Sequence, residues 1–464
     1  MDTTELKKIW QKKYEIVPEQ LNKVKEIYSA VTAFNTNIDA VIKITPEKIQ
    51  TLISDLNLSL SELEDIKQTK ILSPQDIIKG IFKCFKNGIA EEWITEEKDV
   101  YNWLNTKLGY DRLQIGGQGG IVANVLSTVG IKKVIVHTNS LPKLQAEQFV
   151  KNDNLYSFDE NGQLKPAYLI NRDNDTALIH WIIEFNRGDT IEIEGKKFRC
   201  PKSNRFIATY DPLNLKLIID KPFMDYIQNN ETEYVVLSGF HALTSNNNGV
   251  ELIEKIVPKI KKWKEYNKNG IFHLEVASTQ DLDVRKAIVY KIAPLMDSIG
   301  INERETIDVL EAIGETNLAQ RCSVKTTAEN LFAGIVKIKE TLKINRVQLH
   351  MFGLYITLQD TGFKITPEQN LKGMMTAATL AAAKAGTGSI DDLLFAHGNM
   401  VSDVGLIEVD GLATSIGQYD LDITGITRYR NWDLIAIPTI LIEKPVTLVG
   451  MGDTISSVSL VAAR

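Results

Sequence analysis

Cysteine is scarce in this chain of 464 residues. The three cysteines, Cys84, Cys200 and Cys322, are far apart in the sequence and match no zinc-ligand spacing. Scattered cysteines in an odd number fit a reducing compartment. We therefore expect a cytoplasmic protein without a zinc site.

Long hydrophobic runs and an excess of positive charge are also missing. No apolar stretch approaches the roughly 20 residues of a membrane-spanning helix. The first residues, MDTTELKKIWQKKYE, lack the apolar segment of a secretory signal. The formal net charge of −6 argues against a nucleic-acid binder held by phosphate contacts. We expect small-molecule partners, no membrane or nucleic acid, and a monomer or small homo-oligomer.

Two common nucleotide-binding patterns are absent as well. No glycine-rich loop ends in G-K-[ST], so the chain has no P-loop. No G-x-G-x-x-G follows a first strand with an acidic partner further along, which argues against a dinucleotide-dependent oxidoreductase.

The stretch TLVGMGDTISSVSLVAA offers a phosphate site of another kind. Residues 447–449 are expected to end a buried strand, Gly450 and Gly452 to form a tight turn, and residues 454–463 to form a helix. The unpaired N–H groups at such a helix start favour an anion. Asp453 would compete with a phosphate there, unless it accepts a proton from an attacking hydroxyl while the N–H groups hold the phosphoryl group. The alternative is that Asp453 is only a helix N-cap.

Two further segments suggest a ligand site. Residues 113–130, LQIGGQGGIVANVLSTVG, place four glycines before an amphipathic helix, which allows close approach of a ligand or, alternatively, of a helix to a sheet. Asn35, Asn37 and Asp39 follow a strand expected at 31–34. Ligands bind beyond the carboxyl ends of strands in open α/β sheets, and these groups suit sugar hydroxyls. A polar turn is the alternative.

The pattern of the whole chain predicts an α/β fold. With 44% hydrophobic and 24% charged residues it is an ordinary globular protein, long enough for more than one domain. Helical signals cover 4–30 and 46–87, and short β-rich segments in 164–211 predict a small mixed or antiparallel sheet. From 215 onward strands alternate with helices, which predicts a parallel sheet. Expected strands there are 235–243, 271–278 and 346–358.

Polar pairs near the ends of these strands suggest a metal site. His273 and Glu275 share a face if they lie on a strand, and Asn302 and Glu305 share a face of a helix start. Two carboxylates and an amide near a phosphate would hold Mg²⁺, largely through its waters, whereas zinc is disfavoured because no cysteine joins them. The alternative for each pair is a buried structural hydrogen bond.

The order of NTNID, GGQGG with a following asparagine, SNRFI, HLE, INERE and KPVTLVGMGDT resembles the archaeal ADP-dependent sugar kinases. These are the ADP-dependent phosphofructokinases and glucokinases of the ribokinase-like superfamily, and the resemblance spans nearly the whole chain. It implies a ribokinase-like large domain with a central, mostly parallel sheet flanked by helices, plus a smaller β-rich lid domain. We expect the large, nucleotide-binding domain to comprise 1–38, 114–164 and 212–464, and the lid 39–113 and 165–211.

The resemblance also implies roles for single residues. Asp453 would be the base, and Gly450 and Gly452 would flank the oxyanion hole for the β-phosphate of ADP. The residues expected on the sugar are Asn35, Asn37, Asp39, Gly117, Gln118 and His180. Arg205, in SNRFI, resembles the arginine that clamps the nucleotide phosphates, and the other residues expected on the nucleotide side are His350, Val446 and Gly452. The expected magnesium ligands are Glu275, Glu305 and Asp453, supported by Asn302 and His273.

The implied reaction transfers the β-phosphate of ADP to fructose 6-phosphate, giving fructose 1,6-bisphosphate and AMP in a modified glycolysis. The choice of ADP over ATP rests on the resemblance alone. Glu91 matches a position where a glutamate goes with glucose binding, while Lys165 and Arg172 are candidates for the sugar phosphate, so we expect glucokinase activity as well. The alternatives are a strict ADP-dependent glucokinase and a non-catalytic sugar- or nucleotide-binding module of the same fold.

Overall fold

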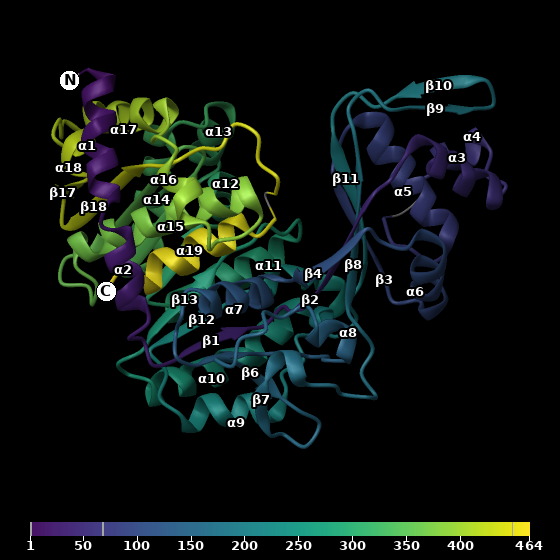
Figure 1. Cartoon of the computed structure of the whole chain (residues 1–464), viewed down its shortest axis with the longest axis horizontal. Coiled ribbons are helices and arrows are strands. Elements are labelled where there is room, and N and C mark those ends of the chain that lie inside the picture. The colour runs from purple at the N-terminus through teal and green to yellow at the C-terminus, as the bar shows by residue number, and fades with distance from the viewer. Residues whose placement is uncertain (1, 67–68, 448) are drawn as a thin grey trace.

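The structure, a computed structural model, describes residues 2–66, 69–447 and 449–464. Its elements form a large unit on an eleven-stranded sheet and a small unit on a five-stranded sheet (Figure 1). In spatial order, the large sheet consists of β17 (Ile426–Tyr429), β18 (Trp432–Pro438), β16 (Leu354–Asp360), β15 (Arg346–Met351), β14 (Ser298–Ile301), β13 (Ile271–Glu275), β12 (Tyr234–Leu237), β1 (Ala30–Ala33), β5 (Val134–Val136), β6 (Leu155–Phe158) and β7 (Leu164–Pro166). The strands from β15 to β6 run parallel, and the outer strands pair antiparallel.

Helices cover both faces of the large sheet, and each face has its own apolar core. The helices of one core are α9 (Lys221–Asn229), α10 (Gly249–Tyr266), α11 (Leu282–Ala287), α12 (Glu303–Ala312), α13 (Thr316–Val324), α14 (Ala328–Leu342), α17 (Asp403–Ile416) and α18 (Leu421–Thr424). Those of the other are α1 (Thr3–Tyr14), α2 (Val17–Val24), α7 (Gln118–Thr128), α8 (Lys143–Ala146), α15 (Pro367–Thr387), α16 (Leu393–His397) and α19 (Met451–Val461). Burial on both faces explains why β12 and β5, in the middle of the sheet, consist of apolar and aromatic residues.

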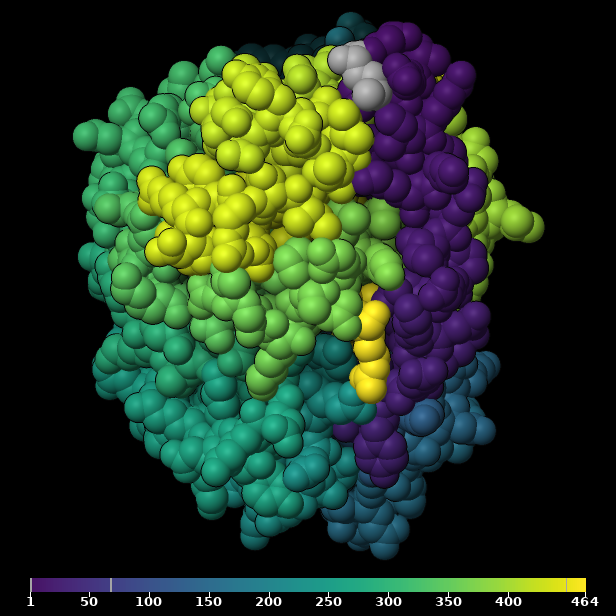
Figure 2. Space-filling model, turned by 90° about the vertical axis from the view of Figure 1, so that its left-hand side faces the viewer, coloured from purple at the N-terminus to yellow at the C-terminus, as the bar shows by residue number. Residues whose placement is uncertain are grey.

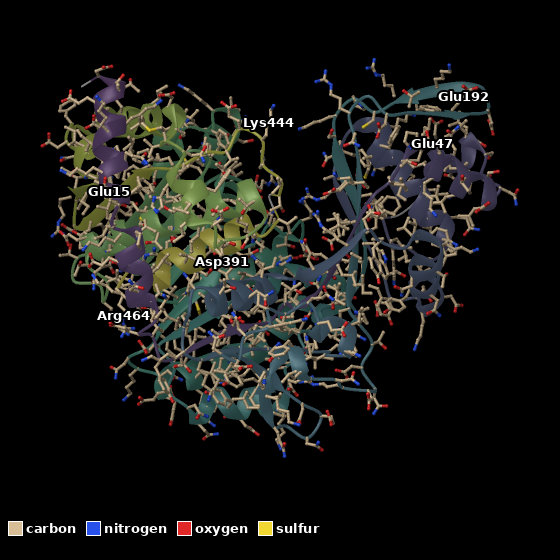
Figure 3. All side chains as sticks on the ribbon, viewed as in Figure 1. Glu15, Glu47, Glu192, Asp391, Lys444 and Arg464 are labelled. Atoms are coloured by element: carbon tan, nitrogen blue, oxygen red, sulfur yellow. The ribbon has the colours of Figure 1, made fainter. Side chains whose placement is uncertain are left out.

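The small unit has only one covered face. Its strands, in spatial order, are β3 (Glu91–Thr95), β11 (Asn204–Tyr210), β8 (Ile179–Phe185), β2 (Asn37–Lys43) and β4 (Arg112–Gly116), and a separate hairpin comprises β9 (Thr190–Ile193) and β10 (Lys196–Arg199). Its helices, α3 (Pro46–Asp55), α4 (Leu60–Glu64), α5 (Pro74–Asn87) and α6 (Lys98–Trp103), pack on the face that carries Trp181 and Phe206. Glu47 and Glu192 lie on its outer part, far from Arg464 (Figure 3).

The second N-terminal helix, α2, lies beside the C-terminal residues and helps to hold the last helix in place. In Figure 2 the N-terminal helices run beside the C-terminal residues. The Gln20 amide donates to the carbonyl oxygen of Arg464 at 2.8 Å, and it also bonds the carbonyl of Ala462. No helix in the described ranges is long and apolar enough to cross a bilayer.

The α/β class with its mostly parallel central sheet is confirmed, but several local predictions are wrong. The strand expected at 235–243 ends at Leu237. Residues 346–358 form a hairpin, β15 and β16, because Gly353 turns the chain with a φ of 84°. Among the described residues of 441–450 there is no strand, and Leu448 lies outside the described residues. The helix α19 begins at Met451, three residues earlier than expected.

The segments expected to form the lid supply most of the small sheet. The match is not residue for residue, since β2 begins at Asn37 and β4 extends to Gly116. Lys165, expected in the lid, lies on β7 of the large sheet.

Candidate active site

The N-terminus of α19 forms a turn that we call the anion turn, residues 449–454. Gly450 has a φ of 64°, a left-handed conformation that glycine adopts without strain. A Cβ at this position would lie 2.7 Å from Cγ2 of Ile121, so only glycine fits. The N–H groups of the first helical turn and the helix dipole make this turn suitable for an anion.

Asp453 lies within the anion turn and is 9% exposed. Burial raises the pKa of its carboxyl to about 6, although the Lys384 ammonium and a hydrogen bond with Gln118 lower it. Gly450 holds the N-cap position, so Asp453 is not the helix cap. A carboxylate with this pKa is largely ionised at pH 7 and is a stronger base than a solvated aspartate.

The second glycine-rich segment, residues 116–120, is the glycine turn, and it lies against Asn35. The Gly119 N–H donates to the carbonyl oxygen of Asn35 at 2.9 Å, and a Cβ at Gly117 would approach the same oxygen to 2.6 Å. Gln118, at the start of α7, accepts a hydrogen bond from the Gly239 N–H at 3.2 Å. Since the Gln118 side chain also lies beside Asp453 and lowers the pKa of its carboxyl, it joins the glycine turn to the anion turn.

A polar cluster lies beside the glycine turn on the uncovered face of the small sheet. Strand pairing sets Asp39 opposite His180, and Asn37 donates to the Asp39 carboxylate at 3.1 Å. His180 Nε2 lies 3.1 Å from Oδ2 of Asp211. The buried Oδ1 of Asn37 has no hydrogen-bond partner within the described residues, so it can accept from a ligand hydroxyl.

The charges of this cluster support one another. Burial raises the pKa of Asp39 to about 6, and the neighbouring His180 acts in the opposite direction. Burial lowers the pKa of His180, but the hydrogen bond to Asp211 and the carboxylates of Glu92 and Asp39 outweigh it and bring the value to about 9. His180 is therefore a cation at neutral pH.

The structure turns Glu91 away from this cluster. Its carboxylate pairs with Lys83 of α5 at 2.7 Å and accepts from the Trp93 indole at 2.8 Å, on the covered face. The next residue, Glu92, points to the uncovered face because side chains alternate along a strand. It accepts from Thr209 at 2.6 Å and lies 3.9 Å from His180. The placement of Glu91 does not support the expected contact with sugar, whereas Glu92 occupies that side.

The residues expected to organise magnesium gather behind the anion turn. His273 is fully buried and its Nε2 lies 2.8 Å from Oγ of Ser456 in α19. Burial and the Arg346 cation lower the pKa of His273 well below its usual value, so it is a neutral, structural histidine. Asn302 and Glu305 form the capping box of α12, with hydrogen bonds of 2.8 and 2.9 Å.

Three carboxylates in this region lie within electrostatic range. Burial, Asp453 and Glu305 together raise the pKa of Glu275 well above its usual value. Burial raises that of Glu305 to about 8, opposed by the Asn302 N–H and assisted by Asp453. Within the described residues, no three such side chains are close enough to bind a metal ion directly.

The remaining expected residues lie on several elements. Arg205 is exposed on β11. It lies on the same face as His180, because Thr209, four residues further along the strand, pairs with His180. The imidazole of His350 lies close to the anion turn, since a Cβ on Gly452 would be 3.1 Å from its Nε2. Burial lowers the pKa of His350 to about 4. Val446 is 61% exposed.

The two candidates for a sugar phosphate have structural partners in the large unit. Lys165 pairs with Asp159 at 2.6 Å. Arg172 donates to the carbonyl oxygens of Phe158 at 2.9 Å and Thr138 at 3.2 Å. Their role at a phosphate stays a prediction, and these contacts do not favour it for Arg172.

Sequence reasoning missed several polar residues that the structure brings to this region: Lys384, Asp211, Asn214, Glu92 and His241. Lys384 follows a run of small, buried residues on α15. A charged residue on such a buried stretch of helix is the only feature of the sequence that could have indicated a role for it. His241 follows β12, so the rule that ligands bind beyond strand ends could have found it. The others lie among many similar polar residues and give no signal of their own.

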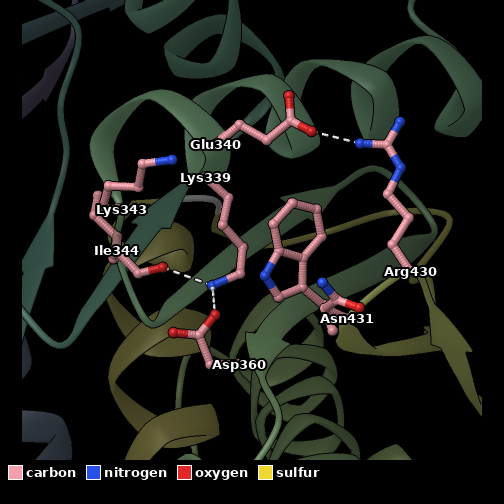
Figure 4. Close-up of a pocket in the computed structure, with 8 residues that line it drawn as sticks. Lys339, Glu340, Lys343, Ile344, Asp360, Arg430 and Asn431 are labelled. Carbon is pink, nitrogen blue, oxygen red and sulfur yellow. Dashed lines mark hydrogen bonds and ion pairs between the residues drawn. The ribbon is translucent and has the colours of Figure 1, made fainter.

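A pocket of about 360 Å³ lies elsewhere, at the end of β16 and the start of β18 (Figure 4). Lys339 pairs with Asp360 at 2.7 Å, and Arg430 pairs with Glu340. The start of β15 is close by, so the pocket is at the opposite end of the sheet from the anion turn. Both of its carboxylates are paired with cations, and we assign it no role in the reaction.

Comparison with known proteins gives a consistent result over the whole chain. Residues 29–462 match the family model described as the ADP-specific Phosphofructokinase/Glucokinase conserved region. An ADP-specific phosphofructokinase from Pyrococcus abyssi is 31% identical, covering 92% of this chain and 96% of the relative. An ADP-dependent glucose/glucosamine kinase from the same organism is 30% identical, covering 98% of both. A solved ADP-dependent kinase complex with fructose-6-phosphate and ADPbetaS is 29% identical with a TM-score of 0.81, covering 100% of this chain and 98% of the other. The chain therefore belongs to the family of ADP-specific phosphofructokinases and glucokinases.

Proposed function

We propose that the protein transfers the β-phosphate of ADP to a hydroxyl of fructose 6-phosphate, giving fructose 1,6-bisphosphate and AMP. The observation that carries this proposal is the position of Gln118. It belongs to the glycine turn beside Asn35, and its side chain acts on the carboxyl of Asp453 in the anion turn. A phosphate-binding turn and a hydroxyl-binding cluster thus share one base. Family membership adds ADP and fructose 6-phosphate as the expected pair, since relatives carry those names.

In the proposed reaction Asp453 accepts the proton of the sugar hydroxyl while the hydroxyl oxygen forms its bond to the β-phosphorus. The bond from the β-phosphorus to the bridging oxygen breaks, and AMP leaves with the electron pair. The N–H groups of the anion turn hold the charge of the transferred group. Transfer of this kind depends mainly on positioning and charge neutralisation. Closure of the small unit over the site would exclude water as a competing acceptor.

Magnesium fits the carboxylates of Glu275, Glu305 and Asp453. Burial is the main cause of their raised pKa values. Asp453 adds to it at Glu275 and Glu305, and Glu305 adds to it at Glu275, so a divalent cation would favour their ionised forms. Direct coordination by all three is not available within the described residues, so the ion would be held largely through its waters, as Mg²⁺ prefers. When bound, it would neutralise charge on the diphosphate.

Glucose is a second proposed acceptor. A relative named as a glucose/glucosamine kinase matches the chain over nearly its full length. Glu92 and Asp39 supply carboxylates that can accept from sugar hydroxyls.

The test is a phosphate-transfer assay that crosses ADP and ATP with fructose 6-phosphate and glucose, in wild type and in Asp453→Asn. We expect ADP-dependent turnover of fructose 6-phosphate, lost by a factor of 10² to 10⁴ in the variant while ADP binding persists. Turnover with ATP alone would overturn the choice of donor. Unchanged turnover in Asp453→Asn would remove the assigned base, and no turnover with any pair would favour a non-catalytic binding module.

A further inference from the structure

Asn214 lies where the two units meet and is 4% exposed. It begins the short turn η3 (Asn214–Lys216), which follows β11 of the small sheet. Its Nδ2 donates to Oδ2 of Asp211 at 2.7 Å and to Oδ1 of Asn35 at 3.0 Å. Its Oδ1 accepts from Nδ2 of Asn139 at 2.8 Å. One buried carboxamide therefore holds side chains that follow three different strands.

Asp211 fixes the direction of every hydrogen bond in this group. An ionised carboxylate only accepts, so the donor end of the Asn214 amide must face Asp211. Its acceptor end then faces Asn139, which must present its own NH₂ group. By the same logic Asn35 must present its oxygen to Asn214. The orientation of each asparagine amide therefore follows from which of its neighbours can donate or accept a hydrogen bond.

One donor and one acceptor are consequently not used by the hydrogen bonds of this group. The NH₂ group of Asn35 and the oxygen of Asn139 both point away from Asn214. The Asn139 oxygen is buried and, within the described ranges, has no hydrogen-bond partner. The same is true of the Oδ1 of the fully buried Asn37. Buried acceptors without partners are unfavourable and are usually satisfied by a ligand or water. A set of donors and acceptors of this kind is complementary to sugar hydroxyls, which do both.

The same group connects the small unit to the large one. Asp211 bonds His180 of the small sheet at 3.1 Å through the oxygen that Asn214 also contacts. Asn35 and Asn139 belong to the large unit, where they follow β1 and β5. A substitution of Asn214 would therefore alter the position of polar side chains in both units.

We propose that Asn214 is a positioning residue for the sugar and that Asn139 is a further sugar-binding side chain whose oxygen accepts from a hydroxyl. The inference rests on the proposed function, because it needs a sugar at this cluster. It adds two residues and fixes the orientation of their amides.

The test uses Asn214→Asp, which keeps the shape but presents an acceptor to Asp211, and Asn139→Ala, which removes the free oxygen. We expect the KM for fructose 6-phosphate to rise at least 10-fold in the first and about 5-fold in the second. The KM for ADP should stay within 2-fold of wild type in both. Asn139 is only partly buried, so its variant remains informative if Asn214→Asp fails to fold.

Asn154 offers a matched control, because its amide also makes several hydrogen bonds. It accepts from Ser127 and donates to the carbonyl oxygen of Ile131 at 2.7 Å, near the C-terminal end of α7 and not at the glycine turn. Asn154→Asp should lower the melting temperature and leave both KM values unchanged. An unchanged sugar KM in folded Asn214→Asp and Asn139→Ala, or equal changes for sugar and ADP, would overturn the proposal. Absence of ADP-dependent turnover in wild type would instead contradict the proposed function.

Discussion

The ammonium group of Lys384 lies 3.2 Å from the carbonyl oxygen of Gly450, at the start of the anion turn. The same group donates to Oγ1 of Thr454 at 3.0 Å. Burial lowers the pKa of Lys384, while Asp453 raises it. A lysine from α15 therefore holds the turn of α19 in shape and places a positive charge next to the proposed phosphate site.

Replacing Lys384 with methionine should reduce kcat with ADP on the order of 10- to 100-fold, because a charged donor near the transferred group is lost. Arginine at this position should restore part of the activity. The measurement is steady-state kinetics with ADP and fructose 6-phosphate. Lys372→Met on the same helix is the control, since Lys372 contacts none of these groups in the described residues. A kcat equal to wild type in folded Lys384→Met would show that the charge has no part in transfer.

Glu91 and Glu92 should separate stability from sugar binding. Glu91→Gln breaks the ion pair with Lys83, which is partly buried, and should lower the free energy of unfolding by about 1 kcal/mol with little effect on sugar KM. Glu92→Gln should raise the KM for glucose about 5- to 10-fold, because a charged acceptor beside His180 is lost. Thermal denaturation and glucose kinetics measure the two effects. The reverse pattern would restore the role that sequence assigned to Glu91.

This pair shows what the sequence could and could not predict. The motif GIAEEW identified a useful carboxylate, but two adjacent glutamates on a strand face opposite sides. Only the pairing of β3 with β11, and the helices on one face, decide which side meets the sugar. Register is a long-range property, so the choice lay beyond local pattern.

Features set by local chemistry were easier to predict. The glycine turns and the Asn302–Glu305 capping box follow from glycine conformation and helix-end hydrogen bonding. Lys384 and Asn214 could not be identified, because their contacts with Gly450 and Asn35 join residues that are 66 and 179 positions apart in the sequence. The hairpin at Gly353 did have a local signal, a glycine inside a long apolar run, which marks a turn.

Glu305 should govern the magnesium requirement. Glu305→Gln removes one of three neighbouring carboxylates, so the Mg²⁺ concentration for half-maximal activity should rise on the order of 10-fold. Titration of Mg²⁺ at saturating ADP checks this. Glu311 lies on the same helix and pairs with Arg285. Glu311→Gln therefore serves as the control and should leave the Mg²⁺ requirement unchanged. Equal Mg²⁺ dependence in wild type and both variants would remove Glu305 from the metal site.

His180 should make stability depend on pH in a defined window. Its pKa in the folded protein is about 9, above the unfolded value near 6.5, because Asp211, Glu92 and Asp39 outweigh the effect of burial. The charged histidine therefore stabilises the fold fully below pH 6.5, and this contribution is lost as the pH rises through 9. It amounts to roughly 2–3 kcal/mol.

The difference in free energy of unfolding between wild type and His180→Asn should thus be large at pH 6 and smallest above pH 9.5. Denaturant titrations at several pH values measure it. His137 is the control, because burial lowers its pKa to about 4 and it stays neutral over this range. The difference between wild type and His137→Asn should be constant from pH 7 to 9.5. A constant difference for His180→Asn as well would mean that His180 is neutral in the folded protein, and that the cluster facing the sugar carries one positive charge fewer.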